Sequence, residues 1–87
     1  MSKVKLQQML SRNLELKGAE FKLEKIGSKL AGSIISETFR GISDRRRQKM
    51  IWDALDAELG EASIRKVGTL LAFTPEEWNM NLPAEVG

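Results

Sequence analysis

The stretch FRGISDRRRQKMIWDALDAELGE, residues 39–61, predicts the long helix on which the fold depends. Ser43 is a good N-cap for this helix, and Gly60 supplies a stop after Leu59. Apolar side chains recur with helical spacing and give the helix one buried face: Met50, Ile51, Ala54 and Leu55. A helical connection of this length usually returns the chain parallel to the strand that it left. The stretch therefore predicts a parallel pair of strands on either side of it.

The residues before this helix predict a helix and a hairpin. Apolar side chains at helical spacing indicate a first helix within residues 3–17, and Gly18 is a plausible stop. From residue 19, apolar and charged side chains alternate as in a half-buried strand, which ends at a turn over residues 27–29. A second strand over residues 30–38 follows so closely that an antiparallel hairpin is the natural connection.

The residues after the long helix complete one domain. Residues 63–73, SIRKVGTLLAF, predict a third strand that is covered on much of both faces. In residues 74–78, TPEEW, a threonine N-cap, a proline at the first helical position and a glutamate form a capping box, which predicts a short final helix. We expect an α+β domain over residues 3–78, with a three-stranded mixed sheet and helices packed on one face, and a disordered tail over residues 79–87.

The composition excludes several classes of function. The chain of 87 residues has no cysteine and no histidine, so it lacks a disulfide framework, a thiolate metal site and the commonest general base. We therefore expect no enzyme activity, no cofactor, no bound metal and no small-molecule substrate. No apolar run approaches the roughly 20 residues of a membrane span, so we expect no membrane partner and a cytoplasmic location. The net charge of +2 is too small to indicate a nucleic-acid partner by itself.

The charges of the long helix stand in an unfavourable order. Arg45, Arg46 and Arg47 open it and carboxylates gather at its end, although each misplaced charge forgoes or reverses roughly 0.3–1 kcal/mol of interaction with the helix dipole. Lys49 extends the basic stretch, and Lys66 adds a charge later in the chain, next to Arg65. One interpretation is a solvated basic face. The other is an anion site, where helix amides and cations bind phosphate or an acidic partner.

Three other features of the helix allow two interpretations each. Arg47 lies one turn before Ile51 on the apolar side, so its stem can pack while its head reaches a carboxylate or a strand-end carbonyl. Gln48 and Trp52 share one flank, where the tryptophan either covers the edge of the core or forms a docking patch with the glutamine. The carboxylates at the helix end scatter around it, which favours a solvated acidic face over a catalytic or metal site: Asp53, Asp56, Glu58 and Glu61.

Several of these motifs together resemble the BolA family. The run SETFRGIS at residues 36–43, then Arg47, Ile51-Trp52 and Leu55, and finally TPEEW at residues 74–78 match the family pattern in order and spacing. The resemblance covers about residues 3–78. It implies a fold similar to the type II KH domain, with the order α-β-β-α-β-α. It also implies partnership with monothiol glutaredoxins, a part in iron-sulfur cluster handling and, in bacterial members, DNA binding and transcription regulation.

The departures from the family pattern narrow its implications. The family's helix histidine falls on Gln48, and residues 27–30, where the second cluster ligand of the family would lie, contain neither histidine nor cysteine. Because soft and borderline metals prefer imidazole or thiolate, the cluster-ligating role does not carry over. The chain also lacks the GXXG loop of KH domains and interleaved basic and aromatic residues, so any nucleic-acid binding would be directed at phosphates and would depend strongly on salt.

The resulting hypothesis is a non-catalytic, regulatory BolA-like module that contacts DNA, RNA or another anionic partner through the basic start of its long helix. The alternative is an adaptor that docks a monothiol glutaredoxin or an iron-sulfur assembly partner without ligating the cluster. The predicted partner-binding residues are Arg45, Arg46, Arg47, Gln48, Lys49, Trp52 and Lys66.

Overall fold

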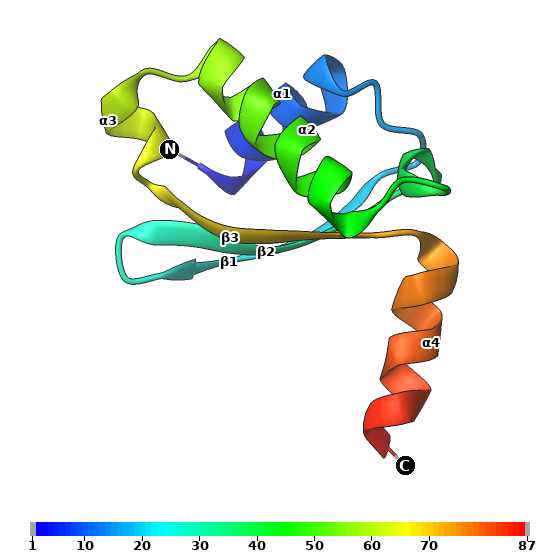
Figure 1. Ribbon diagram of the computed structural model, residues 1–87. Helices are drawn as coiled ribbons and strands as arrows, with labels where there is room; N and C mark the ends of the chain where they lie inside the picture. Colours follow the sequence, from blue (N-terminus) through cyan, green and yellow to red (C-terminus); the bar gives the residue numbers. More distant parts are fainter. Residues whose placement is uncertain (1, 87) are drawn as a thin grey trace.

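The structure, a computed structural model, describes the backbone of residues 2–86 and the side chains of residues 2–80. Its elements in chain order are α1 (Lys3–Asn13), β1 (Glu20–Ile26), β2 (Lys29–Ile35), η1 (Glu37–Phe39), α2 (Asp44–Glu58), α3 (Glu61–Ile64), β3 (Val67–Phe73) and α4 (Pro75–Val86) (Figure 1). The sheet has the order β1-β2-β3. Strand β2 pairs antiparallel with β1 and parallel with β3, so the predicted mixed sheet and the parallel return through α2 are confirmed.

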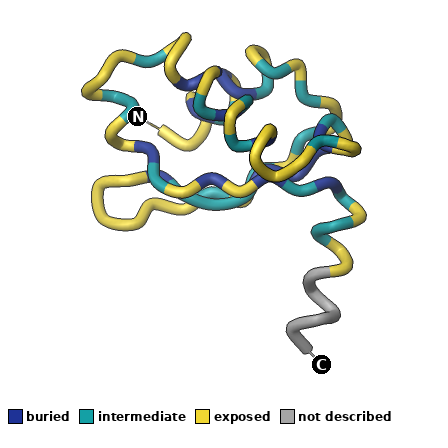
Figure 2. Tube along the Cα trace, viewed as in Figure 1, coloured by how far each residue is buried: buried dark blue, intermediate teal, exposed yellow. Residues whose placement is uncertain are grey.

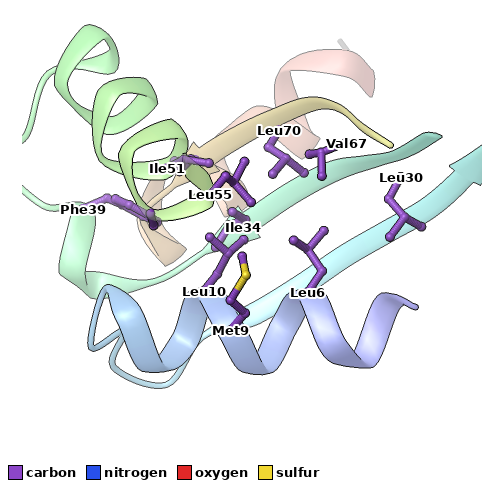
Figure 3. Packing of buried hydrophobic residues seen from close by; sticks show 12 residues of the cluster. Leu6, Met9, Leu10, Leu30, Ile34, Phe39, Ile51, Leu55, Val67 and Leu70 are labelled. Atoms are coloured by element: carbon purple, nitrogen blue, oxygen red, sulfur yellow. The ribbon is translucent and has the colours of Figure 1, made fainter. Parts of the chain in front are cut away.

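The two long helices α1 and α2 cover one face of the sheet, as expected, and α4 leaves the end of β3 in a direction away from both (Figure 1). Side chains from α1, α2 and the inner face of the sheet meet between these layers (Figure 3). The buried core consists of Leu6, Met9, Leu10, Leu30, Ile34, Phe39, Ile51, Ala54, Leu55, Val67, Leu70 and Ala72. None of the described helices is long and apolar enough to cross a membrane.

Three predicted boundaries were wrong. Helix α1 ends at Asn13, because Glu15 adopts a positive φ of 50°. Strand β2 ends at Ile35, because Ser36 caps the short helical turn η1 with its side chain. The residues before Val67 do not begin the third strand; the chain first makes one helical turn, α3, closed by the amide of Ile64 donating to the carbonyl of Gly60 at 3.0 Å. These short turns are local hydrogen-bonding choices that the apolar pattern does not record.

The predicted disordered tail over residues 79–87 falls mainly outside the residues whose side chains are described, and it stays a prediction. The predicted capping box is present at the start of α4. The amide of Glu77 donates to Thr74 Oγ1 at 3.1 Å, and the amide of Thr74 donates to Glu77 Oε1 at 2.9 Å. This reciprocal pair satisfies two backbone donors at the point where β3 turns into α4.

The SETF run, residues 36–39, has a structural task. Ser36 is fully buried, and its Oγ donates to the carbonyl of Lys17 at 2.8 Å while it accepts from the amide of Thr38 at 3.2 Å. Thr38 Oγ1 accepts in turn from the amide of Lys17 at 3.0 Å. The run therefore ties the loop after α1 to the end of β2, and it places Phe39 in the core.

Gly32 marks the tightest approach between β1 and β2. Its φ is +147°, and a Cβ atom at this position would overlap the carbonyl oxygen of Lys22 on β1. Gly32 pairs with Leu23 in the antiparallel register, and the parallel pairing with β3 shifts between Leu30 and Gly32. Only a residue without a Cβ allows this backbone conformation and this spacing together.

Arg47 joins α2 to β3 and α4. Its side chain is 6% exposed, and its guanidinium forms a bidentate pair with Glu77, at 2.6 Å to Oε1 and 3.1 Å to Oε2. The same group donates to the carbonyl of Ile42 at 2.7 Å and to the carbonyl of Ala72 at 3.1 Å, and it lies 5.9 Å from the ring centre of Phe39. Each of the three guanidinium nitrogens of this buried charge therefore donates at least one hydrogen bond.

The same contacts change the acidity of Glu77. Hydrogen bonds from Arg47, followed by the one from the Thr74 amide, lower the pKa of the Glu77 carboxyl from its ordinary value of 4.5 to about 2. Because the pKa is lower in the folded protein, the ionised carboxylate stabilises the fold above pH 4.5. This contribution is lost as the pH falls toward the folded pKa.

Replacing Gly32 with alanine should destabilise the domain strongly. The new Cβ would force β1 and β2 apart, so we expect a loss of about 3 kcal/mol or more in the free energy of unfolding. Gly68→Ala is the matched control in the same sheet, since a Cβ there meets neighbouring atoms only at 3.4 Å or beyond. Thermal melts of both variants test this; equal melting temperatures would contradict the role given to Gly32.

Replacing Arg47 with alanine should also be costly. The change leaves the carbonyls of Ile42 and Ala72 without their donor and Glu77 without its partner, so we expect a loss of about 3 kcal/mol. Arg45→Ala, at an exposed arginine two positions earlier, should change stability by less than about 0.5 kcal/mol. Denaturant titrations of the two variants make the comparison, and similar midpoints would show that Arg47 is dispensable to the fold.

The Glu77 pKa predicts a specific acid sensitivity. The parent protein should exceed Glu77→Gln in stability above pH 4.5, and this difference should shrink as the pH falls toward about 2. Glu37, whose pKa is lowered chiefly by a hydrogen bond from Arg40, remains in both proteins and cancels in the difference. Urea unfolding over a series of pH values measures it. Curves that run parallel at every pH would rule out the linkage.

Candidate functional site

The start of α2 carries the exposed cations that the sequence singled out. Arg45, Arg46 and Lys49 are exposed, and we call these three residues the basic surface. Ser43 caps the helix as predicted, since its Oγ accepts from the amide of Arg46 at 3.3 Å. Asp44, an acid in the first turn, interacts favourably with the helix dipole and so offsets part of the unfavourable interaction of the arginines. Within the described residues, the guanidinium groups of Arg45 and Arg46 make no hydrogen bond or ion pair, so they are available to a partner.

Lys49 is engaged on its own helix. Its Nζ lies 3.1 Å from Asp53 Oδ2, one turn later, and both side chains are largely exposed. Such a surface pair is worth only about 0.5 kcal/mol or less, so a stronger anion can compete for the lysine. The available positive charge is nevertheless concentrated at Arg45 and Arg46.

Arg47 does not belong to this surface. Of its two sequence interpretations, the structure supports the structural one, with the stem packed and the head on a carboxylate and a strand carbonyl. Its guanidinium is already occupied by Glu77 and by the carbonyls of Ile42 and Ala72. The helical turn thus directs Arg47 inward while Arg45 and Arg46 face solvent.

Gln48 is also occupied by the fold. Its Nε2 donates to the carbonyl of Leu70 on β3 at 2.6 Å, and the side chain is half-buried. Strand β3 lies at the edge of the sheet, so Gln48 and Arg47 together bind two of its carbonyls, those of Leu70 and Ala72. Gln48, the residue on which the resemblance places a histidine, therefore ties α2 to β3.

Trp52 is half-buried and packs against the core cluster. This placement supports its interpretation as a cover for the edge of the core. Because Gln48 beside it is bonded to β3, the docking patch envisaged for the pair has little free polar surface.

Lys66 is not brought to the basic surface. It directly precedes β3, whereas α2 begins near the other end of that strand, where Arg47 contacts Ala72. Seven residues of strand separate the two ends, a distance of roughly 20 Å. Lys66 instead borders a small separate hollow, together with Lys25, Ser28 and Leu30. The hairpin turn between β1 and β2 is exposed (Figure 2).

The acidic end of α2 shows no metal-like arrangement. Among the described residues, no group of three or more histidine, cysteine, aspartate or glutamate side chains is placed to hold a metal ion. Glu58 instead bonds α1, accepting from Arg12 at 3.3 Å and from Asn13 at 3.1 Å. Asp53, Asp56 and Glu61 are exposed, in agreement with a solvated acidic face.

Sequence reasoning missed a groove beside the basic surface. It has a volume of about 410 Å³ and is lined by Ile42, Arg46, Lys49, Met50 and Asp53. Met50 was assigned to the buried face, but it is only half-buried and forms part of the groove floor with Ile42. Its spacing of four from Arg46 was the available signal, because residues four apart lie on one side of a helix.

No protein-family model and no curated protein sequence matches the chain. Solved structures do match its fold. A bolA protein homologue from Coxiella burnetii has a TM-score of 0.68 at 19% identity, over 91% of this chain and 97% of its own. BolA1 from Arabidopsis thaliana has a TM-score of 0.63 at 20% identity, over 85% and 92% respectively. For the BolA domain of SufE1 from Arabidopsis thaliana the TM-score is 0.60 at 22% identity, over 88% and 98%. The chain has the BolA fold, as its sequence motifs implied.

Proposed function

We propose that this chain is a non-catalytic BolA-like binding module that holds an anionic partner at its basic surface. The observation that carries the proposal is the pair of exposed, unengaged arginines at the start of α2, Arg45 and Arg46. Their position costs dipole energy, and the fold does not use their side chains. A partner that brings negative charge would offset this cost.

Catalysis has little support at this surface. The buried polar side chains of the described region are Ser36, Arg47 and Thr74, and each is hydrogen-bonded within the fold. The altered pKa values belong to the ion-paired groups of Arg40 with Glu37 and of Arg47 with Glu77. These shifts follow from structural pairs rather than from a group prepared for proton transfer.

Nucleic acid is the first candidate partner. Phosphates would satisfy Arg45, Arg46 and Lys49, and binding by three such contacts would weaken strongly with salt. The basic surface contains no aromatic side chain on which a base could stack. Binding of this kind would therefore depend little on sequence.

A protein partner is the second candidate, and the groove beside the basic surface favours it. The partners implied by the family resemblance are a monothiol glutaredoxin or an iron-sulfur assembly protein. Either would present both charged and apolar side chains to the groove. The chain has no histidine and no cysteine, and Gln48 is bonded to Leu70. Its role in such a complex would be that of an adaptor that leaves the cluster ligands unchanged.

Charge reversal at the basic surface should separate binding from folding. In Arg45→Glu/Arg46→Glu, acids replace cations at a helix N-terminus, so the free energy of unfolding should stay within about 1 kcal/mol of the parent or rise. Binding of a fluorescent single-stranded DNA or RNA, measured by anisotropy at low salt, should be abolished by like-charge repulsion. The control is Arg65→Glu/Lys66→Glu, which makes the same change in net charge at the far end of β3.

Single replacements refine this test. For each phosphate contact removed, as in Arg45→Ala or Lys49→Ala, the slope of log affinity against log salt should fall by about one unit. A markedly lower melting temperature of the charge-reversed protein would assign the arginines to the fold. Equal loss of binding in both double variants would show attraction by net charge and no defined surface.

The adaptor candidate predicts an unchanged cluster. When the chain is mixed with a cluster-loaded monothiol glutaredoxin, a complex should form on gel filtration while the visible absorption and circular dichroism of the cluster stay those of the glutaredoxin alone. The reason is the absence of thiolate and imidazole ligands in this chain. New cluster bands on mixing would show that the chain does supply a ligand.

A further inference from the structure

The groove on α2 combines an apolar floor with a charged rim. Arg46, Lys49, Met50 and Asp53 follow the spacing that places residues on one side of a helix, and Ile42 closes the groove beyond the helix start. Gln48, which bonds to Leu70 on β3, lies on another flank of the helix. The groove is therefore separate from the contacts that fasten α2 to the sheet.

Charge is distributed unevenly along the rim. Lys49 is paired with Asp53 at 3.1 Å, whereas the Arg46 guanidinium has no partner within the described residues. Asp44, the nearest acid of the first turn, approaches Arg47 at 3.9 Å and does not line the groove. The groove thus has a positive end at Arg46, an apolar middle at Ile42 and Met50, and a neutralised end at Lys49 and Asp53.

We propose that this groove receives an acidic protein segment that inserts one aliphatic or aromatic side chain between Ile42 and Met50 and places a carboxylate against Arg46. The inference rests on the proposed function, because it names the class of partner for the same surface. Charge complementarity selects the acidic segment. The half-buried floor selects an apolar anchor, and the flexible thioether of Met50 can adapt to its shape.

A nucleic-acid strand fits the groove less well. Its phosphates would bind Arg46 much as a carboxylate does, so the difference between the two partners lies in the apolar floor. Its bases would meet two aliphatic side chains in place of the aromatic platforms that stack bases. These contacts would stabilise a base less than stacking on an aromatic ring does, so the apolar floor favours an aliphatic or aromatic side chain of a protein.

Four probes with fluorescent labels test the proposal by anisotropy at low salt. The first is a flexible peptide with a run of glutamates followed by a single leucine. The second carries serine in place of the leucine, and the third carries glutamines in place of the glutamates. The fourth is a single-stranded oligodeoxynucleotide of the same net charge as the first peptide. The anchor is thus tested by changing the probe, without any effect on folding.

Three protein variants complete the test. Met50→Gln removes apolar floor, Arg46→Gln removes the carboxylate contact, and Arg65→Gln is the control that loses the same charge far from the groove. Thermal melts accompany them because Met50 also packs against the core. Arg46 is exposed, so Arg46→Gln tests the groove independently if Met50→Gln folds poorly.

The leucine peptide should bind about tenfold more tightly than the peptide with serine at this position, because burial of the leucine removes apolar surface from water. This advantage should disappear in Met50→Gln. The glutamine peptide should bind weakly, and Arg46→Gln should weaken the glutamate peptides about threefold to fivefold, while Arg65→Gln leaves them unchanged.

Other outcomes separate this inference from the proposed function. If the leucine and serine peptides bind equally and both lose binding in Arg45→Glu/Arg46→Glu, the proposed anchor in the groove is wrong. Anion binding at the basic surface is then still supported. Tighter binding of the oligonucleotide, unaffected by Met50→Gln, would assign the surface to nucleic acid and also overturn the proposed anchor. No binding of any probe at low salt would overturn both.

Discussion

The buried guanidinium of Arg47 is the constraint on which the arrangement of the chain depends. A charge that is withdrawn from water must have every donor matched, because each unmatched partner is costly. Its acceptors come from three segments: the carbonyl of Ile42 before α2, the carbonyl of Ala72 on β3 and the carboxylate of Glu77 on α4. One side chain therefore links these three segments.

This constraint also separates structure from function within a single helical turn. Arg45, Arg46 and Arg47 are neighbours in sequence, but the helix turns each about 100° from the last. Arg47 faces the sheet, while Arg45 and Arg46 face solvent. The basic surface thereby lies on the turn of α2 that Arg47 ties to β3 and α4.

The elements that follow from the spacing of apolar residues could be predicted from the sequence. The side-chain contacts between residues far apart in the chain could not. Three patterns involve only residues that are close in sequence: the alternation in β1, the apolar stripe of α2 and the capping box at Thr74. The order of elements and the parallel return of β3 were therefore predictable. The bond from Gln48 to Leu70 was not, since spacing gives the side of a helix and not its neighbour. Lys66 was grouped with the arginines by charge alone, yet the length of β3 separates them.

The side chains of α2 along β3 have a consequence for how the chain meets copies of itself. An open strand edge is a template on which another strand can add, which leads to aggregation. Here Gln48 and Arg47 already donate to carbonyls of β3, so an incoming strand would have to displace their side chains from these two acceptors. The opposite edge, β1, exposes charged residues along its length instead: Glu20, Lys22, Glu24 and Lys25. A sheet this small is thus protected from self-association on one side by occupied acceptors and on the other by solvated charge.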